Sequence, residues 1–183
     1  MGYLHYSPSL GTMARCTTPD KCPFSHWDTE AMKRMAPITL SGKPEIIQKA
    51  YVGLFVKPES IAPALNQLRT AMDPDLFDLV TRNKAKRDNG DNYHMTLVGW
   101  REYKKLKADG KNIDVLDKGF HFNLIGVGTV SNSTTQTWYA IAQSVAIDNW
   151  RNELGLPRHD LHITLGFTSA DIHGVPKNHT TLV

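Results

Sequence analysis

Two stretches of the sequence share one pattern and decide the predicted fold: Tyr93-His94-Met95-Thr96-Leu97-Val98-Gly99-Trp100 and Leu161-His162-Ile163-Thr164-Leu165-Gly166-Phe167. Each has the composition of a β-strand, in which alternate side chains point to the same face. His94 and Thr96 therefore share a polar face, and His162 and Thr164 share another. The residues between them are apolar. The pattern predicts two strands that each place one imidazole and one hydroxyl opposite a hydrophobic core.

Outward from these strands, the same order of elements occurs twice. A strand, a helix and a strand carrying His-x-Thr-Leu follow one another at residues 50–97 and again at 135–165. Internal duplication of this kind predicts two similar lobes that face each other across a central cleft. The predicted fold class is α+β, with α/β as the alternative. Each of the two pseudo-symmetric lobes is expected to have a small antiparallel sheet with helices on its outer face.

The paired motif suits the cleavage of a phosphodiester. This reaction needs a base for the attacking oxygen and an acid for the leaving oxygen, and an imidazole with a pKa of about 6.5 can act as either near neutral pH. A threonine hydroxyl on the same face can donate a hydrogen bond to a non-bridging phosphate oxygen. The arrangement requires no metal. A metal site at the two histidines is the alternative, but threonine is a poor zinc ligand and neither motif contains a cysteine or carboxylate pattern.

These residues resemble the signature of the two-histidine phosphoesterase superfamily. That superfamily includes RNA 2′,5′-ligase-like proteins, cyclic phosphodiesterases and phage enzymes that degrade cyclic-nucleotide alarm signals. The resemblance covers residues 49–170 and implies a bilobal fold with metal-independent cleavage in a central groove. It also implies that His94 and His162 are the general acid and base, in an order that depends on the substrate, and that Thr96 and Thr164 bind phosphate.

The sequence around and after the second motif narrows the resemblance. Asp160-Leu-His-Ile-Thr-Leu-Gly-Phe167, followed by Asp171-Ile-His-Gly-Val175, is similar to the RNA repair-like branch known as the Swiss army knife. The expected function is the cleavage of a nucleotide phosphodiester, either a 2′,3′-cyclic phosphate at an RNA end or a 2′,5′ linkage. Two alternatives stay open: hydrolysis of a cyclic oligonucleotide immune signal by an anti-defence enzyme, and a non-catalytic RNA- or nucleotide-binding module.

The segments between the motifs contain candidate substrate-binding residues. Residues 82–92 are basic and then rich in Asn, Asp and Gly, which predicts a mobile loop. Its Lys86 and Arg87 are candidates to close over phosphates, and a solvated basic loop is the alternative. Trp138 and Tyr139 lie in the strand that opens the second unit. One of them is expected to face the cleft and stack on a base, while the other packs in the core.

Other aromatic and histidine residues are interpreted as structural. Tyr93 and Trp100 flank the first motif and are predicted to be core or rim residues. His159 and His173 lack the partner geometry of the two motifs. They are therefore expected to be ordinary surface or structural residues.

Residues 1–46 form a predicted N-terminal extension to a phosphoesterase domain at 47–183. Five residues separate Cys16 from Cys22, and three separate Cys22 from His26, an order that resembles the second half of a Cys₃His zinc finger. His5 is the nearest candidate for the fourth ligand of a tetrahedral structural zinc. The alternative is that both cysteines are free thiols or are buried in the extension.

The composition of the 183-residue chain is that of one globular domain with mild charge. The formal net charge of +3 does not by itself predict nucleic-acid binding. There is no apolar run of about 20 residues that predicts a membrane span, and the N-terminus lacks the apolar centre of a secretion signal. The expected partner is a nucleotide or RNA substrate, not a membrane, and the expected location is the cytoplasm. The sequence carries no signal for the oligomeric state.

Overall fold

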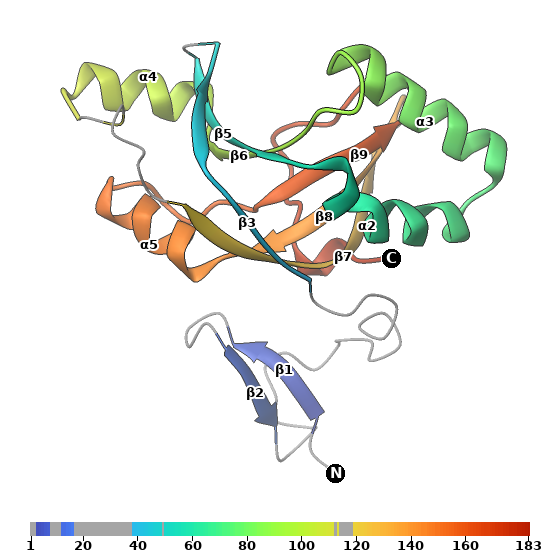
Figure 1. Ribbon diagram of the computed structural model, residues 1–183, viewed down its shortest axis with the longest axis horizontal. Coiled ribbons are helices and arrows are strands. Elements are labelled where there is room, and N and C mark those ends of the chain that lie inside the picture. Colours follow the sequence, from blue (N-terminus) through green and yellow to red (C-terminus); the bar gives the residue numbers. More distant parts are fainter. Residues whose placement is uncertain (1–2, 8–11, 17–37, 49, 112, 114–118) are drawn as a thin grey trace.

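The computed structural model describes residues 3–7, 12–16, 38–48, 50–111, 113 and 119–183 (Figure 1). In this part of the chain a single curled sheet of seven antiparallel strands forms the main domain, in the order β3-β7-β8-β9-β6-β5-β4. The strands are β3 (Ile38–Gly42), β4 (Pro44–Ile47), β5 (Tyr51–Val56), β6 (Tyr93–Val98), β7 (Phe120–Ser131), β8 (Gln136–Gln143) and β9 (His162–Phe167). A separate two-stranded sheet pairs β1 (Tyr3–Ser7) with β2 (Thr12–Cys16).

The two strands that carry the His-x-Thr motifs are neighbours near the centre of the large sheet. β6 and β9 pair antiparallel, with Met95 opposite Ile163. The predicted alternation is confirmed, because Met95, Leu97, Ile163 and Leu165 are fully buried in the core. The motif side chains therefore emerge together from the opposite face.

Four α-helices accompany the sheet in the described residues. Their bounds are α2 (Pro58–Ala71), α3 (Pro74–Arg87), α4 (Trp100–Ala108) and α5 (Val145–Glu153), and a short 3₁₀ helix, η2 (His179–Thr181), lies near the C-terminus. In Figure 1, α2 and α3 lie on the right of the view and α4 and α5 on the left. None of the helices in the described part of the chain is both long and apolar enough to cross a bilayer.

The prediction of a mobile loop at residues 82–92 is wrong for its first half, which belongs to α3. The carboxylate of Asp73 caps this helix by accepting from the backbone N–H groups of Asp75 and Leu76, and Pro74 occupies the first helical position. The basic residues lie in the last turn, where positive charge is favourable. Gly166 lets α3 approach β9 closely, because a Cβ atom at Gly166 would lie 2.8 Å from a methyl carbon of Val80.

The mixed helix-and-strand class and the antiparallel pairing are confirmed. The structure has one continuous large sheet in place of the two separate sheets that were expected, because β6 and β9 pair with each other. The pseudo-symmetry of two lobes stays a prediction. Strands β3 and β4 form the two edges of the sheet, so the sheet extends upstream of residue 47, the predicted start of the domain. Pro44 is compatible with this position because an edge strand tolerates a residue without an N–H group.

The predicted zinc ligands fall mostly outside the described residues. His5 belongs to β1 and Cys16 to β2, where the register pairs His5 with Ala14 and Cys16 with Tyr3. Cys22 and His26 lie outside the part of the chain that the structure describes. The structural zinc therefore stays a prediction.

Candidate active site

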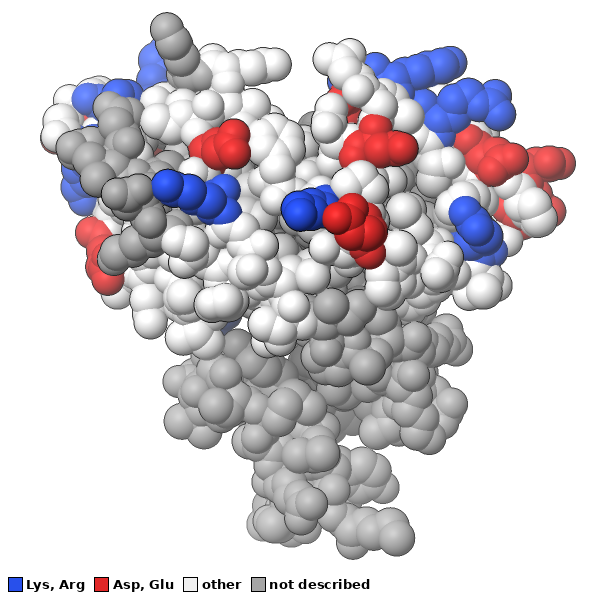
Figure 2. Space-filling view, in the orientation of Figure 1, with Lys and Arg blue, Asp and Glu red and all other residues white. Residues whose placement is uncertain are grey.

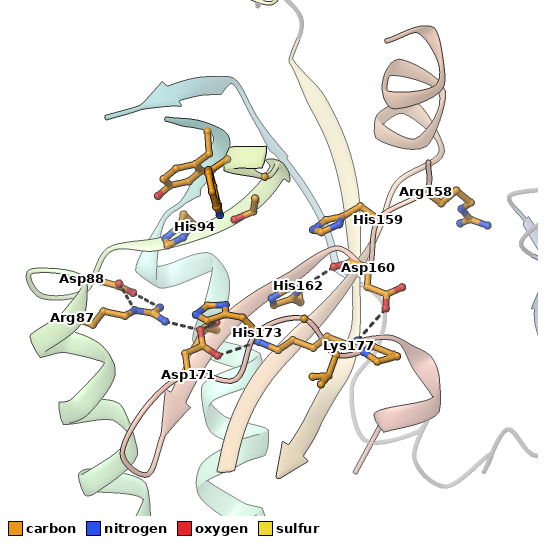
Figure 3. Close-up of a pocket in the computed structure, with 18 residues that line it drawn as sticks. Arg87, Asp88, His94, Arg158, His159, Asp160, His162, Asp171, His173 and Lys177 are labelled. Atoms are coloured by element: carbon orange, nitrogen blue, oxygen red, sulfur yellow. Dashed lines mark hydrogen bonds and ion pairs between the residues drawn. The ribbon is translucent and has the colours of Figure 1, made fainter. Parts of the chain in front are cut away.

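The four motif residues line one cavity of about 820 Å³ (Figure 3). His94 and Thr96 reach it from β6, and His162 and Thr164 reach it from β9. The two imidazoles are partly buried, as is the Thr96 side chain, and Thr164 is buried. The arrangement brings two groups that can exchange protons to the wall of a cavity that is large enough for a nucleotide.

His162 is held as a neutral imidazole with a defined tautomer. Its Nδ1 lies 2.8 Å from the backbone carbonyl oxygen of Asp160, and because a carbonyl only accepts, Nδ1 must donate. Nε2 of the neutral ring is then the unprotonated nitrogen. Burial, followed by the positive charge of Lys177, lowers the pKa of His162 to about 4. The ring of Tyr139 packs edge-on against it, with 5.6 Å between the ring centroids. His162 is therefore unprotonated at neutral pH, with the lone pair of Nε2 available.

We expect the His162 ring to remain neutral at pH 5.5, because this pH lies above a pKa of about 4. An ordinary exposed histidine, with a pKa of about 6.5, would be mostly protonated there. Long-range ¹H–¹⁵N NMR spectra recorded across a pH titration measure both the midpoint and the tautomer. His162→Asn assigns the signal by its disappearance. A midpoint near 6.5, or a proton on Nε2, would contradict the assignment of this ring as a base.

His94 lies among aromatic side chains of β5. Its ring centroid is 6.0 Å from that of Tyr51 and 6.3 Å from that of Phe55. Burial lowers the pKa of His94, the carboxylate of Asp88 opposes this shift, and the Arg87 guanidinium adds to it. The protonation of His94 therefore depends on its burial and on the opposing charges of Asp88 and Arg87.

Thr164 donates its hydroxyl proton to a carboxylate beside the cavity. Its Oγ1 lies 3.0 Å from Oδ2 of Asp171, and Nζ of Lys177 lies 3.0 Å from Oδ1 of the same carboxylate. Arg87 also donates to Asp171 through Nη1. A hydroxyl has one proton, so in this arrangement Thr164 offers the cavity a lone pair. This differs from the prediction that Thr164 donates to a phosphate oxygen.

Asp171 is an ionised carboxylate that joins several parts of the site. Burial opposes its ionisation, but the positive charges and hydrogen bonds of Lys177 and Arg87 outweigh that effect and lower the pKa of Asp171 to about 2. Arg87 is also paired with Asp88 through Nε and Nη2, at 2.6 and 2.9 Å. The dashed lines in Figure 3 trace this chain of contacts from Asp88 to Lys177. The cations therefore keep fixed positions beside the motif residues.

Of the predicted substrate-binding residues, only Arg87 lines the cavity. Lys86 is exposed on α3. Trp138 and Tyr139 are both buried, and neither contributes to the cavity wall, so this arrangement offers no stacking surface in β8. Tyr139 faces the motif side but is covered, because its hydroxyl donates to Oγ1 of Thr181 at 2.7 Å.

Several cavity residues were not recognised in the sequence. His159 and His173 line the cavity although they were expected to be ordinary surface or structural residues. Trp100, which was predicted to be a core or rim residue, lines the cavity with 59% of its surface exposed. The position of Trp100 at the end of the first motif strand is the sequence feature that indicated a rim residue. Nothing in the sequence pattern points to Lys177, and Tyr51 reads as part of an apolar strand.

The charged groups that line the cavity are balanced in number, with three cations and three anions: Arg87, Arg158, Lys177, Asp88, Asp160 and Asp171. Over the face drawn in Figure 2, basic and acidic side chains are also interspersed. Recognition of an anionic substrate must then come from individual donors inside the cavity. In the described residues, no group of three or more His, Cys, Asp or Glu side chains is arranged to hold a metal ion.

Comparison with known proteins identifies the family of the chain. Residues 51–173 match the family described as Swiss Army Knife, 2H phosphoesterase domain. No curated protein and no solved structure matches the chain. The matched region runs from the start of β5 to His173 and contains both His-x-Thr motifs. Membership of this family supports a phosphodiesterase-type activity. The chain therefore belongs to the 2H phosphoesterases of the Swiss Army Knife type.

Proposed function

We propose that the protein is a metal-independent phosphodiesterase that cleaves a nucleotide phosphodiester, either a 2′,3′-cyclic phosphate at an RNA end or a 2′,5′ linkage. The observation that carries the proposal is the pair of imidazoles, His94 and His162, on neighbouring strands at the wall of one cavity. Two imidazoles on one substrate can supply the base and the acid that phosphodiester cleavage requires.

For a cyclic phosphate, His162 is the base and His94 the acid. Nε2 of His162 takes a proton from a water molecule as its oxygen forms a bond to phosphorus. The bond from phosphorus to the leaving 2′ or 3′ oxygen breaks, and that oxygen receives the proton of His94. The negative charge of the bound phosphate favours the protonated form of His94, which burial disfavours.

Aromatic residues on the His94 side support a nucleotide as the substrate. Tyr51 lines the cavity beside His94, and the exposed ring of Trp100 lines it next to the end of β6. Large exposed aromatic rings at a cavity are suited to stacking on a base. This role, which was predicted for β8, is reassigned to β5 and to the start of α4.

A second candidate is a cyclic oligonucleotide signal, which the size of the cavity favours. A volume of about 820 Å³ lies towards the upper end of the range of small-molecule sites and accommodates more than one nucleoside. The same acid and base would act on it, so only the substrate distinguishes the two candidates.

We expect turnover that is insensitive to EDTA on one member of a substrate panel. The panel contains RNA with a 2′,3′-cyclic phosphate end, 2′,5′-oligoadenylate and cyclic dinucleotides, and the products are separated by chromatography. The substrate that is cleaved fastest distinguishes RNA processing from signal destruction. Activity that EDTA abolishes and a divalent cation restores would contradict the metal-independent mechanism. Tight binding without any turnover would leave a nucleotide-binding module.

A further inference from the structure

A buried lysine lies beside the two histidines. Lys177 lines the cavity although only 2% of its surface is exposed, and it belongs to the segment after β9, beyond the residues that match the family. Figure 3 shows its side chain extending to Asp171. Its charge acts on His162 strongly enough to be the second largest cause of the low pKa of that ring. The lysine is thus within electrostatic reach of the reacting groups.

The ammonium of Lys177 has more N–H groups than hydrogen-bond acceptors among the described residues. Among the described residues, its hydrogen-bond acceptor is Oδ1 of Asp171, at 3.0 Å, and its other contact is the ring of Tyr139, 5.2 Å from Nζ. An ammonium has three N–H groups, so two are left for groups that enter the cavity. Burying an ammonium is costly unless it is paired, and Asp171 supplies that pairing.

Asp171 is itself shared among several donors. Arg87 and the hydroxyl of Thr164 both donate to its Oδ2 atom, while Lys177 donates to Oδ1. The carboxylate is therefore fixed on both oxygens, and it fixes the lysine in turn. Thr164 is connected to the cavity cations through Asp171.

We propose that Lys177 is a further catalytic residue, which donates from Nζ to a non-bridging oxygen of the phosphoryl group, and that Asp171 positions it. The proposal rests on the phosphodiesterase function proposed above. When water attacks phosphorus, the negative charge on the non-bridging oxygens grows, and a fixed, buried ammonium stabilises that charge more than it stabilises the ground state. Lys177 then supplies a hydrogen-bond donor to the phosphoryl oxygen in place of the Thr164 hydroxyl, which donates to Asp171.

The chain offers a matched control in Lys84. This lysine is also 2% exposed, donates to the backbone carbonyl of Asn92 at 2.6 Å and lies over the ring of Tyr93. It does not line the cavity. Lys84 and Lys177 therefore share burial and an aromatic contact but differ in access to the substrate. Lys84 also pairs with Asp88, with 3.7 Å between Nζ and Oδ2, and its charge lowers the pKa of His94 by less than burial or the charge of Arg87 does. Lys84→Met therefore measures what the loss of a buried ammonium outside the cavity does to folding and to these nearby charges.

The test compares wild type, Lys177→Met, Lys177→Arg and Lys84→Met on the substrate identified in the panel. We expect Lys177→Met to lower kcat by roughly 10²- to 10³-fold, as the loss of one donor to a developing oxyanion does. KM should change much less, and Lys177→Arg should recover part of the rate. Lys84→Met should keep the wild-type rate at a temperature where it is folded. A Lys177→Met rate within about threefold of the Lys84→Met rate would overturn the proposal.

Binding of inorganic phosphate, followed by ³¹P NMR, separates this proposal from the proposed function. If the wild type cleaves nothing, the function fails, and the lysine is judged by phosphate affinity alone. We expect Lys177→Met to weaken that affinity at least tenfold relative to Lys84→Met. Equal affinities would show that Lys177 only anchors the C-terminal segment. If Lys177→Met does not fold, Lys177→Gln, which keeps a polar group of similar length, takes its place in both assays.

Discussion

Replacement of His162 by alanine is expected to lower kcat by roughly 10²- to 10⁴-fold, the usual contribution of a general base. The reason is the geometry of the ring. Nδ1 is bound to the carbonyl of Asp160, and Nε2 is the nitrogen without a proton. His94→Ala should cause a loss of similar size, because it removes the acid. The double variant should lose much less than the product of the two, since acid and base act in one step. Initial rates at saturating substrate measure all three.

The control for these variants is His121→Ala. His121 lies on β7 as part of the sequence His-Phe-Asn, without the threonine of the motifs, and it is exposed away from the cavity. We expect this variant to keep the wild-type rate. In the two motif variants KM should change only a few-fold, because the aromatic and cationic groups of the cavity remain. If His162→Ala retained most of the wild-type kcat, the paired-histidine mechanism would be wrong.

The alternation of the motif strands was predictable because it depends on neighbours in the chain. Met95 and Ile163 had to be buried if the histidines were exposed, and the structure confirms this. That β6 and β9 pair with each other was not predictable in the same way, since the register that places Met95 opposite Ile163, 68 positions further along the chain, is set by the whole sheet. The expectation of two separate sheets followed from the repeated sequence pattern and missed the pairing of β6 with β9.

The end of α3 shows how composition can conceal a helix. The Asn, Asp and Gly residues after Arg87 indicate a loop. The predicted loop wrongly included the basic residues that precede them. Those residues are favoured in the last turn of a helix that begins at the Asp73 cap. The error concealed one geometric fact. Because Arg87 lies on a helix that packs against β9, its guanidinium reaches Asp171.

The two motifs predicted four residues of the cavity wall, and the basic segment before the first motif predicted Arg87, but residues that only tertiary contacts bring to the cavity were missed. Asp171 and Lys177 become part of the cavity through tertiary contacts with Arg87 and Thr164. Tyr139 shows the opposite error. Its position in a strand was correct, but the C-terminal segment covers it through Thr181. An aromatic residue in a strand looks the same in sequence whether a later segment covers it or leaves it open.

The largest expected loss of stability comes from replacing Arg151 on α5. Its guanidinium is fully buried and donates to the backbone carbonyls of Leu97 and Pro157 and to both carboxylate oxygens of Glu102. Glu102 also accepts from the backbone N–H of Gly99, at 2.9 Å. Leu97 follows the first motif, and Pro157 precedes the second. One side chain therefore ties the end of β6, the start of α4 and the approach to β9.

Arg151→Ala should lower the free energy of unfolding by about 3–5 kcal/mol, because it leaves the buried carbonyl of Leu97, the part-buried carbonyl of Pro157 and a half-buried carboxylate without their partner. Urea denaturation measures the loss. Arg151→Lys should recover only part of it, since an ammonium cannot reproduce the planar fork that meets four acceptor oxygens on three groups. The control is Lys105→Ala, which breaks an exposed pair with Asp109 and should cost no more than about 0.5 kcal/mol.

A second variant separates the cost of an unpaired charge from the value of the pair. Arg151→Met combined with Glu102→Met removes both ions and keeps apolar volume at the two positions. Because much of the penalty in Arg151→Ala arises from partners left behind, the double variant should be more stable than the sum of the two single losses predicts. A loss below about 1 kcal/mol in Arg151→Ala would mean that water replaces the guanidinium at both carbonyls. The two motif strands would then be held by the β6–β9 pairing and the core alone.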